Sequence, residues 1–452
     1  MGVADAGPTA NTKPDPAEGT AASARASVGG QRLRVLVVTR IFPTAVEPEY
    51  APYNRNQFAA LARRADVQIL AAIPWFPGAG LLRGASDLAK ADALPGPLAK
   101  LKATLVRAGR SKAVELSTVP ARWSTVGLGV KHPRVLLLPK LTALHGPLFA
   151  ASLVAHAAAL RGKVDVVLGS FAYPDGVAAF LLARALGVPA VVKLHGGDMN
   201  VAAKAPAPAR WLRFVMPRLA RVVAVSRALA DEAVTFGVPR ERAVVVENGV
   251  ETSLFRPRDR AAARAELGLP VEGMSLLFVG RIERRKGVFE LVEAMADPRL
   301  SQVRLVWLGE GDESDAIRKL AAPFGDRFTF VGPQPHEGVA SHVAACDALV
   351  LPSWNEGTPN AVVESLSAGR RVVATRVGGI PAVVNDPRLG ELVPVSDPRA
   401  LADAIAKVLA SPYDPLEVAK IGGRHDWDES GERLFDVLRA AANDPAPLRG
   451  FW

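Results

Sequence analysis

Two glutamates with seven residues between them carry the clearest chemical signal in this chain. Residues 356–364 read Glu-Gly-Thr-Pro-Asn-Ala-Val-Val-Glu. The apolar run Ala348–Leu351 before them predicts a buried strand, and Ala361–Ala368 predicts a helix. The start of a helix offers free N–H groups and the positive end of its dipole, which together favour anions. Glu356 at the mouth of this helix and Glu364 inside it would suit a sugar and a ribose, with a diphosphate between them.

The local sequence also predicts how this helix begins. Thr358 is a plausible N-cap, and Pro359 suits the first helical position. Two glutamates at this spacing on an ordinary charged helix usually face solvent. Here, however, the pair follows an apolar strand, and a second phosphate-type motif lies about 75 residues earlier. The combination favours a ligand site over a solvated helix face.

The second motif spans residues 279–287 and reads Val-Gly-Arg-Ile-Glu-Arg-Arg-Lys-Gly. It follows the predicted strand Ser275–Val279, and Gly280 allows a tight exit from that strand. Open α/β sheets bind ligands at the carboxyl ends of their strands, where Arg281 and Lys286 lie. Arginine grips phosphate oxygens with two N–H groups, and lysine adds a mobile point charge. We therefore expect both side chains to contact phosphate.

Several other site types are not suggested by the sequence. No G-x-G-x-x-G follows a strand and no G-x-x-x-x-G-K is present, so neither a dinucleotide enzyme nor a P-loop NTPase is indicated. Arg284 and Arg285 are interpreted as surface cations. The single cysteine, Cys346, excludes an internal disulfide and a cysteine-based zinc site, and we expect it in the core. No D-x-D metal loop stands next to a strand, so no metal and no cofactor are predicted.

The two motifs belong to a longer pattern. Residues 375–381 read Thr-Arg-Val-Gly-Gly-Ile-Pro, residues 194–198 read Leu-His-Gly-Gly-Asp, and residues 247–250 read Glu-Asn-Gly-Val, with Phe255 following. In this order the segments resemble the retaining glycosyltransferases of family 4, which have the GT-B fold. Glu251 stands where the family usually has Asp. The Gly-Gly loop that many members carry after their first strand is also missing, which concerns the acceptor side.

The resemblance implies a role for each matching residue. His195 would contact the donor sugar, Glu356 would hold sugar hydroxyls, and Arg281 and Lys286 would stabilise the leaving diphosphate. These four are the predicted catalytic residues. The predicted donor-binding residues are Gly196, Asp198, Asn248, Gly280, Gly357, Thr358, Pro359, Asn360 and Glu364. The resemblance further implies retention of anomeric configuration, a nucleoside-diphosphate sugar as donor, and a glycan or polyprenyl-linked acceptor in cell-envelope or exopolysaccharide synthesis.

Two alternatives remain open at this stage. A nucleotide-sugar epimerase of GT-B type would share the fold and the diphosphate site but needs no acceptor. The His-Gly-Gly-Asp segment and residues 356–364 disfavour it. A non-catalytic member of a polysaccharide assembly complex is the second alternative, and the intact charged residues of both motifs argue against it. Binding and slow hydrolysis of nucleotide sugars without acceptor would separate the three.

The architecture follows from the order of the elements. A chain of 452 residues is long enough for two domains. Apolar strands alternate with helical runs, which predicts parallel sheets covered on both faces. We expect an α/β protein of GT-B type: a tail over 1–31, a Rossmann-like acceptor-side domain over 32–247, a Rossmann-like nucleotide-sugar domain over 248–424, and a terminal helix in 425–452 that packs back on the first domain. The predicted strands are Arg34–Thr39, Val67–Ala72, Val135–Leu138, Asp165–Gly169, Ala190–Leu194, Val222–Val225, Ala243–Val246, Ser275–Val279, Val303–Leu308, Phe328–Val331, Ala348–Leu351, Val372–Thr375 and Glu391–Val393.

Charge and hydropathy suggest where the protein acts. The formal net charge is +10, and residues 1–250 carry +15 against −5 for the remainder. No nucleic-acid module is recognisable, so an anionic membrane surface explains the basic half better. Residues 83–140 are rich in Lys and Arg, and a short amphipathic helix is predicted there. Residues 1–31 have the composition of a disordered tail without a signal peptide, and Leu141–Leu160 reads as a buried crossover helix. We expect a cytoplasmic protein, peripheral on the inner face of the plasma membrane.

Overall fold

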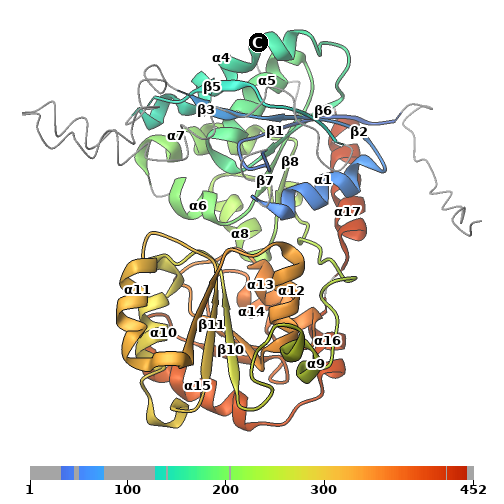
Figure 1. Cartoon of the computed structure of the whole chain (residues 1–452). Coiled ribbons are helices and arrows are strands. Elements are labelled where there is room, and N and C mark those ends of the chain that lie inside the picture. The colour runs from blue at the N-terminus through green and yellow to red at the C-terminus, as the bar shows by residue number, and fades with distance from the viewer. Residues whose placement is uncertain are drawn as a thin grey trace, which may run out of the picture.

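The computed structural model describes residues 32–44, 50–75, 128–138, 141–202, 205–423 and 425–444. The chain forms two domains, each a parallel sheet flanked by helices, which lie one above the other in Figure 1. The chain completes the first sheet before it begins the second, and its last helix returns to the first. This is the GT-B arrangement that the sequence predicts.

Seven of the described strands form the first sheet, in the order β4-β2-β1-β6-β7-β8-β9, and all pairs are parallel. Its central strands are apolar because both faces are covered. Along β1, Val35 and Val37 point into the core under α1 and α17, whereas Leu36 and Val38 point into the core under α4 and α5. The strands are β1 (Arg34–Thr39), β2 (Asp66–Ala71), β4 (Gly129–Lys131), β6 (Val166–Ser170), β7 (Ala190–Leu194), β8 (Arg221–Ala224) and β9 (Ala243–Val245).

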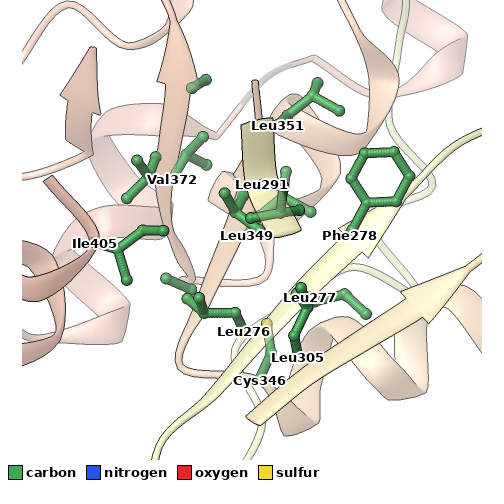
Figure 2. Close-up of a cluster of buried hydrophobic side chains, with 14 of the residues drawn as sticks. Leu276, Leu277, Phe278, Leu291, Leu305, Cys346, Leu349, Leu351, Val372 and Ile405 are labelled. Atoms are coloured by element: carbon green, nitrogen blue, oxygen red, sulfur yellow. The ribbon is translucent and has the colours of Figure 1, made fainter. Parts of the chain in front are cut away.

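Six described strands form the second sheet, in the order β12-β11-β10-β13-β14-β15, again all parallel. Its core is built from strand residues such as Phe278, Leu349 and Leu351, with Ile405 from α15 packing from the side (Figure 2). The strands are β10 (Ser275–Val279), β11 (Arg304–Leu308), β12 (Phe328–Gly332), β13 (Ala348–Leu351), β14 (Arg371–Thr375) and β15 (Gly390–Val393). Cys346 is buried and unpaired, as expected.

Helices cover both sheets (Figure 1). Those of the first half are α1 (Pro52–Ala62), α4 (His145–Ala158), α5 (Val177–Leu186), α6 (Gly197–Ala202), α7 (Pro206–Val215) and α8 (Arg227–Thr235). Those of the second half are α9 (Arg260–Glu266), α10 (Val288–Ala294), α11 (Ser314–Ala321), α12 (His336–Ala345), α13 (Asn360–Ser367), α14 (Ile380–Val383), α15 (Pro398–Ala410), α16 (Pro415–Gly422) and α17 (Trp427–Ala442).

The terminal helix α17 crosses back to the first sheet. Asp426 caps it by accepting the backbone N–H of Glu429 at 2.9 Å. Its apolar stripe of Leu434, Phe435 and Leu438 is buried in the same core as β1 and α1. The last helix of the chain therefore completes the hydrophobic core of the first domain.

The predicted strands agree with the structure to within two residues at each end. Two short strands were not predicted, β3 (Ile73–Trp75) and β4. The predicted strand Val135–Leu138 corresponds to β5 (Arg134–Leu136), which pairs with β3 in a small separate sheet instead of joining the main one. The crossover helix predicted within Leu141–Leu160 is α4.

Two other predictions concern membranes and the basic segment. No helix among the described residues has both the length and the apolar character needed to cross a membrane. Most of the basic segment 83–140, including its predicted amphipathic helix, lies outside the described residues, as does the tail 1–31.

Replacing Leu438 by alanine should destabilise the first domain. Leu438 is fully buried between α17 and the sheet, and truncating such a leucine typically costs about 2–5 kcal/mol of unfolding free energy. Urea unfolding followed by tryptophan fluorescence measures the change. The matched control is Leu416→Ala, because Leu416 on α16 is 67% exposed. Equal midpoints for both variants would mean that α17 contributes little to this core.

Candidate functional site

Lys286 and Glu356 meet at the carboxyl ends of β10 and β13. The lysine Nζ lies 2.6 Å from a carboxylate oxygen of Glu356, and both side chains are largely shielded from solvent. Gly287, just after the lysine, has φ +68°, and a Cβ there would collide with the backbone of Pro352. The two predicted motifs are thus held against each other, and the lysine ammonium lies beside the carboxylate expected to face a sugar.

Arg281 lies in the same loop but is more exposed. Its Nε is 2.5 Å from Glu283, which Arg285 also contacts at 2.5 Å. Burial raises the pKa of Glu283, but the hydrogen bond from Arg285 and the nearby cations outweigh it and lower the pKa below its usual value. The Arg281 side chain is 58% exposed, so it can exchange this surface ion pair for a ligand phosphate.

The start of α13 differs from the predicted capping. Pro359 occupies the N-cap, and Asn360 is the first helical residue. The hydroxyl of Thr358 does not cap the helix; it donates to the carbonyl of Val225, at 3.1 Å, after β8 of the other domain. The prediction of Thr358 as N-cap is therefore wrong, because a partner across the domain boundary takes the hydroxyl. The carbonyl of Gly357 accepts the N–H of Gly379 at 2.6 Å, which brings the 375–381 segment against the same turn.

Glu364 points from α13 toward His336 at the start of α12. Its carboxylate lies 3.0 Å from the His336 Nε2, and both side chains are about nine-tenths buried. Burial lowers the pKa of His336, but the hydrogen bond and the charge of Glu364 outweigh it and raise the pKa above its usual value. The ring of Phe255 lies 4.9 Å from the imidazole. The carboxylate expected to hold a ribose is therefore oriented by a histidine.

The His-Gly-Gly-Asp segment forms the loop between β7 and α6. Asp198 is buried, and its carboxylate accepts the backbone N–H groups of His195, Gly196 and Ala172 at 2.8–3.1 Å. Burial raises its pKa despite these bonds. Because these backbone amides occupy both its oxygens, Asp198 shapes the loop and does not offer a free carboxylate to a ligand. If Asp198 takes part in donor binding, as predicted, its part is indirect: it holds the shape of the loop that carries His195.

The His195 ring is bordered by aromatic residues and by one hydroxyl. The rings of Tyr53 and Phe171 lie 5.1 and 5.9 Å from it. Its Nε2 is 2.9 Å from the Ser170 Oγ at the end of β6, and that oxygen is 3.1 Å from the Asn54 Oδ1. Burial and the positive charge of Lys193 hold the pKa of His195 well below its usual value. The imidazole is therefore neutral at neutral pH.

A buried lysine links the site to the domain boundary. The Nζ of Lys193 on β7 donates to Gln57 of α1 at 2.5 Å and to Asn248 at 3.1 Å. Burial lowers the pKa of Lys193 to about 7. The Nδ2 of Asn248 in turn donates to the side chain of Asn360 at 3.1 Å. Gln57 also donates to Ser430 of α17 at 2.8 Å. The two predicted donor-binding amides, Asn248 and Asn360, are thus part of a polar chain that joins both domains and the terminal helix.

The sequence did not single out His336, Ser170, Asn54 or Lys193. His336 follows the predicted strand Phe328–Val331. The rule that ligands bind at the carboxyl ends of strands, which was applied to Arg281, could therefore have indicated His336 as well. The others are identified only by tertiary contacts. In the part of the chain that the structure describes, no three His, Cys, Asp or Glu residues are grouped to hold a metal ion.

Both halves of the chain match models of known protein families. Residues 273–411 match the model of the glycosyl transferases group 1, and residues 103–254 match that of glycosyltransferase family 4. A D-inositol 3-phosphate glycosyltransferase of Acidothermus cellulolyticus is 33% identical over 321 residues, which cover 65% of this chain and 70% of that protein. A protein of the same name from Catenulispora acidiphila is 34% identical over 62% of this chain and 73% of its own length. Others of this name are covered only to about half, as for the Mycobacteroides abscessus protein at 54%.

Solved structures share the fold. The sucrose-phosphate synthase of Thermosynechococcus elongatus superposes with a TM-score of 0.64 at 22% identity, covering 91% of this chain and 96% of that one. The Anabaena protein Alr3699/HepE, in complex with UDP and glucose, gives a TM-score of 0.62 at 18% identity, covering 90% and 99%. With the order of the motifs and the sheet topology, these matches lead to one conclusion: the chain is a GT-B glycosyltransferase and belongs to glycosyltransferase family 4.

Proposed function

We propose that this glycosyltransferase moves a sugar from a nucleoside-diphosphate sugar to a glycan or lipid-linked acceptor, with retention of anomeric configuration and without a metal ion. The observation that carries the proposal is the position of the Lys286–Glu356 pair, at the point where the loops of the two domains touch. A donor held there by the second domain would present its sugar to the loop of His195.

The leaving group sets the main electrostatic demand of this reaction. Cleavage of the sugar–phosphate bond develops negative charge on the diphosphate. Arg281, Lys286 and the free amides at the start of α13 would stabilise that charge, in place of a divalent cation. Donor binding then requires the phosphate to compete with Glu283 and Glu356 for the two cations.

The remaining site residues would orient the donor. Glu364, already hydrogen-bonded to His336, has a second oxygen with which to accept ribose hydroxyls. Glu356 would hold hydroxyls of the transferred sugar. His195 would contact the same sugar from the first domain. Gly280 and Gly357 would allow the backbone to approach the donor closely.

Contact between the two loops supports a shared site. Gly196 and Gly357 lie so close that a Cβ on Gly196 would be 2.6 Å from the Cα of Gly357. A Cβ on Gly357 would collide with the carbonyl oxygen of His195. The neighbouring Gly197, in contrast, has nothing within 4 Å of its added Cβ. The approach of the two domains therefore depends on glycine at 196 and 357.

The acceptor is proposed from chemistry and comparison. Cell-envelope or exopolysaccharide synthesis would supply a glycan or a polyprenyl-linked sugar. The relatives named D-inositol 3-phosphate glycosyltransferase make that phosphate the first small acceptor to test. The Anabaena structure that holds UDP and glucose makes UDP-glucose the first donor. Transfer to added acceptors, with hydrolysis in their absence as the baseline, separates a transferase from an epimerase, which would convert the nucleotide sugar itself, and from a non-catalytic protein.

A membrane-facing surface on the first domain would suit a lipid-linked acceptor. Leu141, Leu144 and Phe214 are each between 44% and 49% exposed. Trp211 ties α7 to the turn before α4 by donating to the carbonyl of Ala143 at 2.7 Å. Residues 199–230 contain no Asp or Glu, and two of their exposed arginines, Arg210 and Arg213, lie on α7. Apolar and cationic side chains side by side are the combination that binds anionic lipid surfaces.

Arg281→Ala and Lys286→Ala should each lower kcat about a hundredfold, because each removes a donor that stabilises transition-state charge. Turnover is measured at saturating donor with excess chelator present, since the proposal requires no divalent cation. Arg285→Ala is the matched control, an exposed arginine from the same loop that pairs with Glu283. Near wild-type rates for both test variants would refute the diphosphate assignment, and loss of all activity in chelator would refute metal independence.

Gly357→Ala should weaken the approach of the domains and reduce kcat/KM for transfer by at least tenfold, because the new methyl group has no room against the His195 carbonyl. Gly197→Ala adds the same methyl group to the facing loop without a collision and should behave like wild type. Calorimetric binding of nucleoside diphosphate alone, measured for both variants, separates a loss of domain approach from a loss of donor affinity, because Gly357 is also a proposed donor-binding residue. Wild-type transfer by Gly357→Ala would show that the loops need not touch during the reaction.

Salt-sensitive binding to anionic vesicles, and none to neutral ones, is expected of the wild-type protein. Arg210→Glu with Arg213→Glu should weaken it, as each basic residue near such a surface contributes roughly 1 kcal/mol. Lys319→Glu with Lys420→Glu makes an equal charge change on exposed sites of the second domain and should bind normally. Co-sedimentation provides the measurement. If both double variants bind equally, the α7 surface is not involved.

The predicted basic helix outside the described residues is tested in the same assay. Lys100→Glu, Lys102→Glu and Arg107→Glu, combined, should reduce binding if that segment contributes. Failure of the wild type to bind at low salt would argue for a soluble acceptor.

A further inference from the structure

We propose that Ser170 and Asn54 are positioning residues that hold His195 as the neutral tautomer with its proton on Nε2, so that Nδ1 accepts a hydrogen bond from a hydroxyl of the donor sugar. Asn54 lies on α1, Ser170 ends β6, and His195 follows β7. The sugar contact rests on the proposed function. The assignment of the tautomer does not.

The direction of each hydrogen bond follows from the one before it. The chain starts at the backbone carbonyl of Ile41, which can only accept. Asn54 Nδ2 donates to it at 2.7 Å, so the amide oxygen of Asn54 faces Ser170. The Ser170 hydroxyl donates its single proton to that oxygen at 3.1 Å. Ser170 then has only lone pairs left for His195, and the imidazole Nε2, 2.9 Å away, must carry the proton.

The start of this chain is firmly fixed. Asn54 and Ser170 are fully buried. The loop that carries the Ile41 carbonyl is held by Thr39, whose hydroxyl accepts the Ile41 N–H at 2.9 Å and donates to the Ser170 carbonyl at 3.1 Å. Turning the Asn54 amide over would face its NH₂ group toward Ser170 and its oxygen toward the carbonyl of Ile41. Buried polar groups without partners are costly, so this arrangement is disfavoured.

Tautomer choice matters because the ring is neutral. Burial and the charge of Lys193 disfavour the imidazolium form. Two carboxylates on the loops around His195 are already engaged by other groups. The carboxylate of Asp198 accepts the backbone N–H of His195, and Glu356 on the facing loop is paired with Lys286. Tyr53, 5.1 Å away, packs against the ring, and burial raises the pKa of its phenol. The proton is therefore placed by Ser170.

The tautomer defines what the ring can recognise. With Nε2–H engaged by the protein, Nδ1 offers a lone pair and no proton. The ring can then accept a hydrogen bond from a sugar hydroxyl, which both orients the sugar and rejects an analogue that lacks this hydroxyl. With the opposite tautomer, Nδ1–H would be a donor, and the lone pair of Nε2 would leave the Ser170 hydroxyl proton shared between two acceptors.

Nitrogen NMR tests the assignment without any substrate. The full chain is labelled with ¹⁵N-histidine, and long-range ¹H–¹⁵N spectra distinguish protonated from unprotonated ring nitrogens. The His195 signals are identified by their loss in His195→Gln. Wild type should show the Nε2–H tautomer at neutral pH, and Ser170→Ala should show a mixture with Nδ1–H. Ser365→Ala is the control, because this serine is also fully buried and its hydroxyl has no hydrogen-bond partner among the described residues.

Two results would overturn the assignment: an Nδ1–H or imidazolium His195 in the wild type, or an unchanged tautomer in Ser170→Ala. Thermal unfolding of Ser170→Ala and Ser365→Ala shows whether both variants are folded. If Ser170→Ala does not fold, Ser170→Thr, which keeps the hydroxyl, should still show the wild-type tautomer, and the wild-type spectrum alone decides whether Nε2 carries the proton.

Kinetics tests the sugar contact. Ser170→Ala should lose roughly tenfold to a hundredfold in kcat/KM for the donor, the scale of a misoriented contact at a reacting centre. Ser170→Thr should recover most of the activity, and Ser365→Ala should keep it. A mixed tautomer with unchanged kcat/KM would refute the role in transfer. Absence of transfer by the wild type would instead count against the proposed function and leave the NMR result standing.

Discussion

The buried side chain of Lys193 needs hydrogen-bond partners for its Nζ, and several separate parts of the structure supply or hold these partners. The side chain is fully buried and is hydrogen-bonded to two neutral amides instead of a carboxylate. With a pKa of about 7 the group is only partly protonated at neutral pH, but a buried amine in either form is costly unless its N–H groups have hydrogen-bond partners. The two amide oxygens come from α1 and from the segment between the domains, and those amides are fixed by Ser430 and Asn360. The hydrogen-bond partners of Lys193 are therefore all in place only when both domains and the terminal helix are assembled. This polar chain lies directly beneath the His195 loop, so the geometry of the site and the packing of the domains share the same contacts.

The site also depends on how closely the backbones of the two domains approach each other. The site is assembled from loops at the carboxyl edges of two sheets, and its charged groups are few: a lysine paired with Glu356, an arginine on a surface ion pair, and a carboxylate held by His336. All of these lie in the second domain, and the absence of side chains at Gly196 and Gly357, where the domains touch, is what lets the His195 loop approach them. Charge alone would not create this site, because a methyl group at either glycine would hold the His195 loop away from these residues. Electrostatics and steric fit thus contribute together.

Much of the fold could be predicted because strands buried on both faces read as continuous apolar runs, as in Leu276–Phe278 and Leu349–Leu351. The short strands β3 and β4 could not, since three residues containing a proline or a glycine carry little local signal. Loop residues at strand ends, such as Arg281 and Lys286, were predicted by the rule for open α/β sheets. Thr358 was misassigned because its hydroxyl partner lies 133 residues away, and Ser170 was overlooked because its partner Asn54 is 116 residues away. No local pattern encodes such distances.

The return of α17 to the first domain has a consequence for synthesis on the ribosome. The core that holds β1 and α1 also needs Leu434, Phe435 and Leu438, which are translated only after the whole second sheet. At typical bacterial and eukaryotic elongation rates of 5–20 residues per second, the nascent first domain waits roughly 10–40 seconds for this helix. During that interval one face of its sheet is incompletely covered. The second domain has a core of its own and can therefore fold while the first still lacks α17.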